Sequence, residues 1–360
     1  MVAKIKDKNL YYVGGVVRDE ILNIPNFDTD FCYEGNAIEF SKNYNVIKTN
    51  HDFGTVRIIF ENQEIDIAST RKETYPKVGH LPLVSDIGCP LKDDLSRRDF
   101  TINAMAKNTI TGEVIDFFNG LEDIKNKKIK VLHDKSFIED PSRILRALKF
   151  SVRFGFELDK ETENLQNKYL DNINYDMSFH RIKKEIKETF NLNSDIAYNR
   201  FINQNIYKLL GQNQIIPNLT TSIQDLVEQY RPNTVWIVYA GLFNLSNFEL
   251  TAEEKNIIDS YKKIQKLKPK ADLEIYNIFK SLPLESILLY SLTESLEIGK
   301  KYLDILSKIS ISINGDDLKK LGFNQGKVFK EIFNFVLEKK FISPEADKEQ
   351  EIEWVKERFL

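Results

Sequence analysis

A glycine turn and a pair of aspartates near the start of the chain have the residue types and spacing to handle a nucleotide. Gly14 and Gly15 are followed by Arg18 one helical turn later, and Asp28 and Asp30 come about nine residues further on. Bare N–H groups at a helix start bind phosphate oxygens, and an arginine beside them can clamp a triphosphate. Residues two apart share one face of a strand, so the two carboxylates would project together and hold divalent cations.

A third carboxylate, Asp66, lies on a strand expected at 64–68 and could complete this acidic group. Two Mg²⁺ ions held at Asp28 and Asp30 would activate an attacking hydroxyl and hold a leaving pyrophosphate. Each pattern has a plainer interpretation when taken alone. A glycine pair can simply form a tight turn, and an Asp-x-Asp is often a solvated strand edge. Their order and distance favour nucleotidyl transfer.

Two further residues, Asp99 and Asn103, are four apart and are predicted to be neighbours on a helix. A carboxylate and an amide together can accept from and donate to a ribose 2′-hydroxyl, which would select ribonucleotides. An ordinary helix start with exposed charges is the alternative interpretation.

A stripe of polar residues is predicted along one helix after residue 140. Asp140, Arg143, Arg146 and Lys149 are spaced three apart, and Arg153 follows after four. A carboxylate that accepts from an exocyclic amine, beside a guanidinium that donates to a ring nitrogen, suits cytosine and adenine. Uracil and guanine present the reverse polarity, and unpaired buried groups cost about 1–3 kcal/mol each.

The pair Asp140 and Arg143 is therefore predicted to choose the base. Asp140 also precedes Pro141, which is typical of a helix N-cap, and the two roles are compatible.

The elements that must position these groups change character along the chain. Residues 1–120 read as mixed α/β, with strands expected at 10–13, 28–33, 54–60 and 63–68 and a helix at 16–22. A mobile loop is expected at 70–85, which contains two prolines and a glycine. Beyond residue 120 helical patterns dominate, first at 141–155, 160–172 and 178–190.

Bulk properties are those of an ordinary globular chain. It has 360 residues, 42% hydrophobic and 29% charged, with a formal net charge of −3, so two or more domains are expected. No run of about 18 apolar residues occurs, which predicts no membrane span. Two cysteines make no disulfide framework, so a cytoplasmic location is expected. Between residues 125 and 153 nine basic residues face three acidic ones, beside the expected phosphate site.

Five ordered motifs carry a resemblance to a known family. They are Gly14-Gly15-x-Val17-Arg18-Asp19 with Asp28-x-Asp30, then 97–106 (Arg-Arg-Asp-Phe-Thr-Ile-Asn-Ala-Met-Ala), 116–123, 139–147 and 181–185. In this order they resemble the class II tRNA nucleotidyltransferase and bacterial poly(A) polymerase family.

The resemblance implies an α+β fold: a polymerase-β-like nucleotidyltransferase head (residues 1–125), a helical neck for base recognition (126–190), a helical body (191–270) and a helical tail that binds tRNA (271–360). It implies template-free addition of CMP and AMP, from CTP and ATP, to the tRNA 3′ end with Mg²⁺. The residues that it implies at the site are, for metal, Asp28 and Asp30, with Asp66 also catalytic, and, for nucleotide, Gly15, Arg18, Arg98, Asp99, Asn103, Asp140, Arg143 and Arg146. Lys149 departs from the arginine usual in the family, which loses a planar fork.

Several alternatives stay open at this point. The segment from Thr70 to Pro82 resembles a flexible loop that members adding only CC lack, so addition of the terminal A is expected. Residues 313–326 resemble a tail element of the tRNA enzymes, and the C-terminus lacks the strongly basic tail usual in poly(A) polymerases. An A-adding enzyme, a poly(A) polymerase, a glycosyltransferase with an Asp-x-Asp and an inactive RNA-binding module remain as rivals. The oligomeric state is not indicated.

Overall fold

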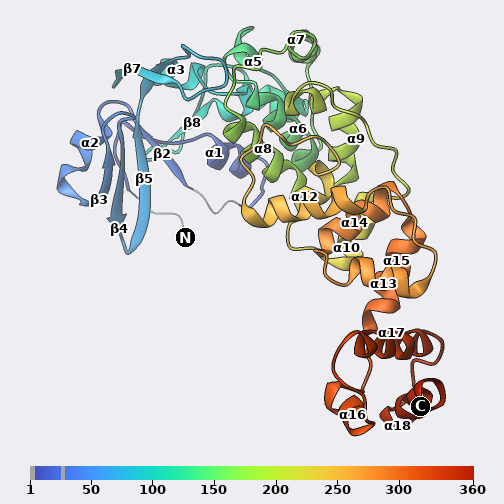
Figure 1. Cartoon of the computed structure of the whole chain (residues 1–360). Coiled ribbons are helices and arrows are strands. Elements are labelled where there is room, and N and C mark those ends of the chain that lie inside the picture. The colour runs from blue at the N-terminus through green and yellow to red at the C-terminus, as the bar shows by residue number, and fades with distance from the viewer. Residues whose placement is uncertain (1–4, 26–28) are drawn as a thin grey trace. The chain divides into compact units, whose positions relative to one another are not determined.

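The computed structural model describes residues 5–25 and 29–360. The chain divides into two compact units, one of residues 1–214 with 246–248 and the other of residues 215–245 with 249–360. The first unit holds all the strands among the described residues, and the second is built from helices (Figure 1). This division fits the α+β class expected from the sequence. The boundaries expected at residues 125, 190 and 270 stay predictions.

A seven-stranded sheet, in the order β3-β4-β5-β2-β1-β8-β9, forms the centre of the first unit. Every neighbouring pair is antiparallel except β2 and β5, which run parallel. The strands are β1 (Leu10–Val13), β2 (Asp30–Tyr33), β3 (Asn45–Asn50), β4 (Thr55–Phe60), β5 (Gln63–Ser69), β8 (Met105–Asn108) and β9 (Val114–Asp116). The predictions at 10–13, 54–60 and 63–68 are confirmed to within one residue, whereas β3, β8 and β9 were not predicted.

Alternation along the strands gives this sheet one apolar face and one that is partly polar. Val56, Ile58 and Ile67 point into a core that α2 (Ala37–Phe40) helps to cover. On the opposite face, the strand register places Lys48 beside Arg57, Arg57 beside Asp66, and Asp66 beside Asp30. These four side chains therefore form one row across β3, β4, β5 and β2.

A hairpin follows the sheet strands where a mobile loop was expected. The strands β6 (Arg71–Thr74) and β7 (Leu83–Ile87) pair antiparallel, so the expectation of a loop over the whole of 70–85 is wrong at both ends. The pairing begins where the backbone N–H of Arg71 donates to the buried Asp94 carboxylate at 3.2 Å. Asp94 belongs to α3 (Leu91–Ser96), and the remaining helices of this region are α1 (Gly15–Ile21) and α4 (Gly120–Lys125).

Helices fill the rest of the first unit. They are α5 (Ser136–Glu139), α6 (Ser142–Phe154), α7 (Lys160–Asp171), α8 (Phe179–Phe190) and α9 (Asp195–Asn203), and α6, α7 and α8 confirm the three predicted helices. The region 126–190 was expected to be helical, but it also contains a pair of short strands. Gly155, with a φ of +66°, turns the chain out of α6 into β11 (Glu157–Leu158), which pairs with β10 (Lys128–Ile129).

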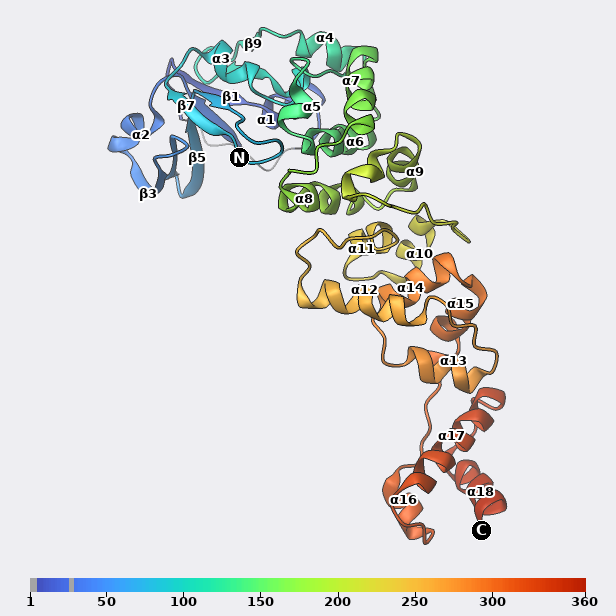
Figure 2. The same ribbon diagram turned by 45° about the horizontal axis from the view of Figure 1, so that its top comes forward.

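The second unit contains helices and no strand among its described residues. They are α10 (Ile223–Tyr230), α11 (Val235–Ala240), α12 (Ala252–Ile264), α13 (Asp272–Phe279), α14 (Leu284–Thr293), α15 (Leu296–Asp304), α16 (Gly315–Lys320), α17 (Lys327–Ile342) and α18 (Lys348–Phe359). Both tryptophans of the chain lie here: Trp236 is buried in α11, and Trp354 packs against the core of the last three helices, of which α17 and α18 lie side by side (Figure 2). No described helix combines the length and hydropathy that crossing a bilayer requires.

Candidate active site

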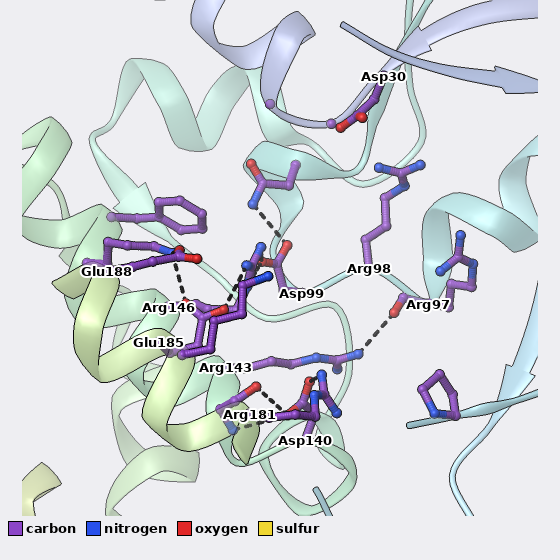
Figure 3. Close-up of a pocket in the computed structure, with 18 of the residues that line it drawn as sticks. Asp30, Arg97, Arg98, Asp99, Asp140, Arg143, Arg146, Arg181, Glu185 and Glu188 are labelled. Carbon is purple, nitrogen blue, oxygen red and sulfur yellow. Dashed lines mark hydrogen bonds and ion pairs between the residues drawn. The ribbon is translucent and has the colours of Figure 1, made fainter. Parts of the chain in front are cut away.

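A polar pocket of about 800 Å³ opens in the first unit. Its walls come from α1, the β6–β7 hairpin, the segment 97–103, α6 and α8. Its described lining includes seven arginines and six carboxylates, with Asp30 at one end and Asp140 at the other (Figure 3). A cavity with this much positive charge suits a polyanionic ligand.

The glycine turn at one end of the pocket needs a residue without a side chain. Gly14 has a φ of +70°, and a Cβ on it would lie 2.9 Å from Nη1 of Arg98. Arg18, on the first turn of α1, lines the pocket but is only 4% exposed. It donates to Asp19 at 2.8 and 2.6 Å and to Asn103.

The rings of Phe150 and Phe154 lie 5.0 and 4.6 Å from the guanidinium of Arg18. Arg18 is therefore fixed by the protein before any phosphate arrives.

Asp99 and Asn103 are brought together as the spacing predicted, although by a different backbone. The structure has a 3₁₀ turn at Thr101–Asn103 where a helix was expected, since Phe100 is extended and forms a bridge with Val131. The amide of Asn103 donates to Asp99 at 2.9 Å. The prediction of neighbouring side chains is confirmed, and the prediction of an α-helix there is wrong.

Arg146 of α6 holds Asp99 through two hydrogen bonds. Its Nε and Nη2 donate to one carboxylate oxygen at 2.8 and 2.6 Å. Burial would raise the pKa of Asp99, but Arg146 and the hydrogen bond from Asn103 outweigh it and lower the pKa to about 2. Asp99 is therefore a fixed anion at neutral pH, which anchors the helix that carries the predicted stripe.

The residues of the predicted stripe all line the pocket: Asp140, Arg143, Arg146, Lys149 and Arg153. Lys149 donates to Glu185 at 2.8 Å and to Glu188, so its ammonium faces carboxylates of α8. Burial acts to raise the pKa of Glu188, but the contact with Lys149 lowers it overall. The lysine at this position therefore ties α6 to α8.

Asp140 and Arg143 lie at the far end of the pocket, and both are buried. Asp140 accepts from the backbone N–H of Ser142 at 3.1 Å, and its other oxygen accepts from Arg181. Helix α6 begins at Ser142 with Pro141 as its N-cap residue, so the prediction of Asp140 as the N-cap is wrong by one residue. Arg143 donates to Ser136 Oγ at 2.8 Å, to the Arg97 carbonyl at 3.0 Å and to the Tyr75 hydroxyl at 3.2 Å. The two predicted base readers are each fixed by other residues and do not pair with each other.

Arg181, Tyr75 and Glu185 are residues of the site that the sequence reasoning did not assign. Arg181 donates to Asp140 and, at 2.9 Å, to the carbonyl of His80 in the hairpin loop. Glu185 contacts both Arg146 and Lys149. The fifth motif, 181–185, was the signal available, because its arginine and glutamate are four apart on one helical face.

The acidic group is only partly described. Asp28 lies outside the described residues. Asp30 lines the main pocket, and Asp66 lines an adjoining pocket of about 400 Å³ that shares Asp30, Arg97 and Arg98 with it. Arg57 donates to both oxygens of Asp66 at 2.7 Å.

Carboxylates on adjacent strands supply the oxygen ligands that Mg²⁺ takes together with substrate phosphates. Asp30 and Asp66 are register partners on one face, so the residues present fit such an ion. Among residues 5–25 and 29–360, no group of three or more His, Cys, Asp or Glu could hold a metal without further ligands.

Comparison with known proteins agrees with this geometry. Residues 10–130 match the family model of the poly(A) polymerase head domain. An A-adding tRNA nucleotidyltransferase of Halalkalibacterium halodurans is 30% identical over an alignment of 364 positions, which covers 92% of this chain and 84% of the relative. One of Aquifex aeolicus is 47% identical over an alignment of 166 positions, which covers 43% of this chain and 20% of the relative.

A solved structure of the Thermotoga maritima CCA-adding enzyme, complexed with tRNA, superposes with a TM-score of 0.75 at 26% identity. The match covers 98% of this chain and 91% of that one. The chain thus spans most of this structure and of the Halalkalibacterium relative, but only a fifth of the Aquifex protein.

Proposed function

The chain belongs to the class II tRNA nucleotidyltransferase family, and we propose that it adds CMP and then AMP, from CTP and ATP, to the 3′ end of tRNA without a nucleic-acid template. The RNA 3′-oxygen bonds to the α-phosphorus while the bond from that phosphorus to the bridging oxygen breaks. Pyrophosphate leaves with the bonding electrons, and the hydroxyl proton goes to water. Membership of this family argues against the alternative of a glycosyltransferase with an Asp-x-Asp.

The observation that carries the proposal is the separate fixing of Asp140 and Arg143 in one pocket. Three of the roughly four acceptor sites of the Asp140 carboxylate are occupied, by Ser142 and Arg181. No described hydrogen bond occupies Nε of Arg143. One acceptor of Asp140 and one donor of Arg143 thus remain at fixed positions. They complement the exocyclic amine and the ring nitrogen that cytosine and adenine both present.

The remaining residues have proposed roles along the nucleotide. Gly15, Arg18 and Arg98 would meet the triphosphate, while Asp99 and Asn103, held by Arg146, would meet the ribose. Asp28 and Asp30, with Asp66 beside them, would hold divalent ions, proposed to be Mg²⁺, which when bound would acidify the attacking hydroxyl and stabilise the pyrophosphate. Pocket arginines supply positive charge that a leaving pyrophosphate needs.

An enzyme that adds only the terminal A is the second candidate. The two curated relatives named above are A-adding proteins, whereas the structural relative is a CCA-adding enzyme. The base readers do not separate the two, because they suit cytosine and adenine alike.

Nucleotide incorporation distinguishes these candidates. Purified protein is given tRNA transcripts that lack all three terminal residues, or only the last one, with CTP alone, ATP alone or both. We expect CMP incorporation from CTP alone on the first transcript and complete CCA with both nucleotides. AMP incorporation on the second transcript without any CMP incorporation on the first would establish the A-adding alternative. The variant Asp30→Ala should lose nearly all activity on both transcripts.

A further inference from the structure

The polar row across the sheet has positive side chains at one end and negative side chains at the other, and binding of a nucleotide in the main pocket does not account for the positive end. Going from β3 to β2, its members are Lys48, Arg57, Asp66 and Asp30, two cations followed by two anions. Strands lie about 4.8 Å apart, so the row extends roughly 14 Å. The acidic end adjoins the main pocket, and the basic end lies beyond it on β3.

The adjoining pocket of about 400 Å³ follows this row. Lys48, Asn50, Thr55 and Arg57 line it on one side, and Asp30 and Asp66 on the other. All three guanidinium nitrogens of Arg57 are engaged by Asp66 and Glu64. Lys48 is exposed and has no ion-pair or hydrogen-bond partner among the described residues, so its ammonium is available to an anion.

In-line phosphoryl transfer requires a site for the acceptor on the side of the phosphorus opposite the leaving group. The attacking and leaving oxygens lie roughly in line on opposite sides of the phosphorus. Arginines of the main pocket would surround the triphosphate, and Asp30 lines both pockets. We therefore expect the attacking hydroxyl to approach Asp30 from the side away from the main pocket, and the adjoining pocket, which shares Asp30 with it, is the candidate for that side.

We propose that the adjoining pocket receives the 3′-terminal nucleotide of the acceptor RNA and that Lys48 contacts one of its last two phosphates. The terminal ribose would then lie between Lys48 and the carboxylates, with its 3′-hydroxyl towards Asp30. Asn50, which lies two residues after Lys48 and lines the same pocket, offers an amide to the same ribose or phosphate. The inference rests on the proposed function, since it assigns the acceptor of that reaction.

Steady-state kinetics of Lys48→Ala and Lys48→Glu test this assignment. We expect Lys48→Ala to raise KM for tRNA about fivefold, the weight of one exposed ion pair, with KM for CTP and ATP unchanged. Lys48→Glu should raise it further. The dependence of log(kcat/KM) for tRNA on log salt should become shallower by about 0.7 for Lys48→Ala, as one phosphate contact to a single strand is lost.

Lys42→Ala is the matched control. Lys42 is also an exposed lysine of the same unit, with 65% of its side chain exposed, and it lines neither pocket. The variant Lys42→Ala removes the same charge from the molecule as Lys48→Ala. Because Lys42 lies outside both pockets, this variant should leave the KM values for tRNA and for the nucleotides unchanged. An equal effect of both variants on the KM for tRNA would mean that net charge acts at long range, and would overturn the proposal.

A neutral linkage in the RNA identifies the phosphate. Transcripts with a methylphosphonate at either of the last two linkages are compared on wild type and Lys48→Ala. With one of them, Lys48→Ala should have no further effect, because the contact is already absent. A full fivefold effect with both transcripts would exclude the contact. Wild-type protein that adds no nucleotide to any tRNA would refute the proposed function itself, a result separate from either kinetic outcome.

Discussion

At the scale of single residues, several charged groups of the pocket are held by another charged group. Arg146 fixes Asp99, Arg181 fixes Asp140, and Glu185 fixes Lys149. A buried ion pair gives little net stability, because desolvation offsets the attraction, but removing one partner is costly. The buried ion pairs of the site therefore serve mainly to hold side chains in place, as the proposed recognition of a base edge requires.

Asp99 provides a prediction for stability against pH. Its pKa in the folded protein, about 2, lies below the ordinary value of 3.8. Its contribution to stability, about 2 kcal/mol, is complete above the unfolded pKa and is lost as the pH falls from about 4 towards 2. Asp99→Asn should lower the thermal unfolding midpoint at pH 5, and the gap from wild type should shrink by pH 2.5, as measured by circular dichroism.

Asp86→Asn is the control for this measurement, because Asp86 is exposed and lies on β7 away from Arg146. It should track wild type at both pH values. A gap between wild type and Asp99→Asn that stays constant from pH 5 to pH 2.5 would show that the charge of Asp99 is not what stabilises the fold.

Arg143→Lys should weaken the choice of base. A lysine keeps the charge but loses the planar fork that reaches Ser136, the Arg97 carbonyl and Tyr75. We expect kcat/KM for CTP to fall about tenfold or more and the ratio of CMP to UMP incorporation to fall with it. Competition between labelled CTP and UTP on one transcript measures this ratio. An unchanged ratio would remove Arg143 from base selection.

Residue roles could be predicted where the spacing fixes a common face, and not where the partner is distant in sequence. The stripe from Asp140 to Arg153 follows from helical periodicity alone. The contact of Arg181 with Asp140 joins α8 to the short link between α5 and α6, and no local pattern specifies which of the basic residues of α8 will reach it. The pairing of Arg57 with Asp66 depends likewise on strand register, which the sequence does not state.

At the scale of elements, the loop of the β6–β7 hairpin is hydrogen-bonded to α5 and α8. The backbone N–H of Gly79 donates to the Glu139 carbonyl at 3.0 Å, and Arg181 donates to the His80 carbonyl. Tyr75, at the end of β6, reaches Arg143. A segment whose composition is typical of a mobile loop thus has its end fixed beside the two residues proposed to read the base, Asp140 and Arg143.

Gly79→Ala should release this loop. Gly79 has a φ of +66°, and a Cβ would lie 2.9 Å from Cβ of Met177 and 3.3 Å from Cδ of Pro141. Hydrogen exchange of the amides in 75–82 should become at least several-fold faster. Gly112→Ala is the matched control, since Gly112 has a φ of +71° but meets only the end of the Lys107 side chain, at 3.9 Å.

Both variants carry the same backbone strain, of about 1–2 kcal/mol. Equal exchange in 75–82 for Gly79→Ala and Gly112→Ala would show that the contact with Met177 and Pro141 does not hold the loop.

Elements with a strong apolar period were predictable, and those without one were not. Helices α6, α7 and α8 were placed to within two residues. Strand β3 is almost wholly exposed, so it has no alternation to detect, and β8 and β9 are only four and three residues long. The parallel pairing of β2 with β5 is a long-range contact, which local patterns do not encode.

At the scale of the whole molecule, the chain passes between its two compact units more than once. Residues 246–248 belong to the first unit, although both flanking segments belong to the second. Phe248 is 7% exposed, and its ring centroid lies 6.0 Å from that of Phe179 on α8. The composition did not indicate that residues 246–248 return to the first unit, because one aromatic residue in a helical region is most simply interpreted as part of the local core.

Phe248→Ala should destabilise the first unit by about 3 kcal/mol, since it removes a large buried ring. For a unit of about 200 residues this corresponds to a fall of roughly 6–12 °C in the unfolding midpoint. Differential scanning calorimetry measures this shift. Phe117→Ala, at a ring that is 46% exposed, should change it little. A similar shift in both variants would contradict the assignment of Phe248 to the first unit.

The placement of both tryptophans in the all-helical unit has a practical consequence for spectroscopy. Indole emission reports the surroundings of Trp236 and Trp354 in the second unit, whereas the described lining of the arginine-rich cavity contains tyrosine but no tryptophan. Quenching of that signal on adding CTP would record a change in the surroundings of these two indoles. A tryptophan substituted at Tyr75 would add an optical probe beside the base readers, with the two native indoles as an internal reference.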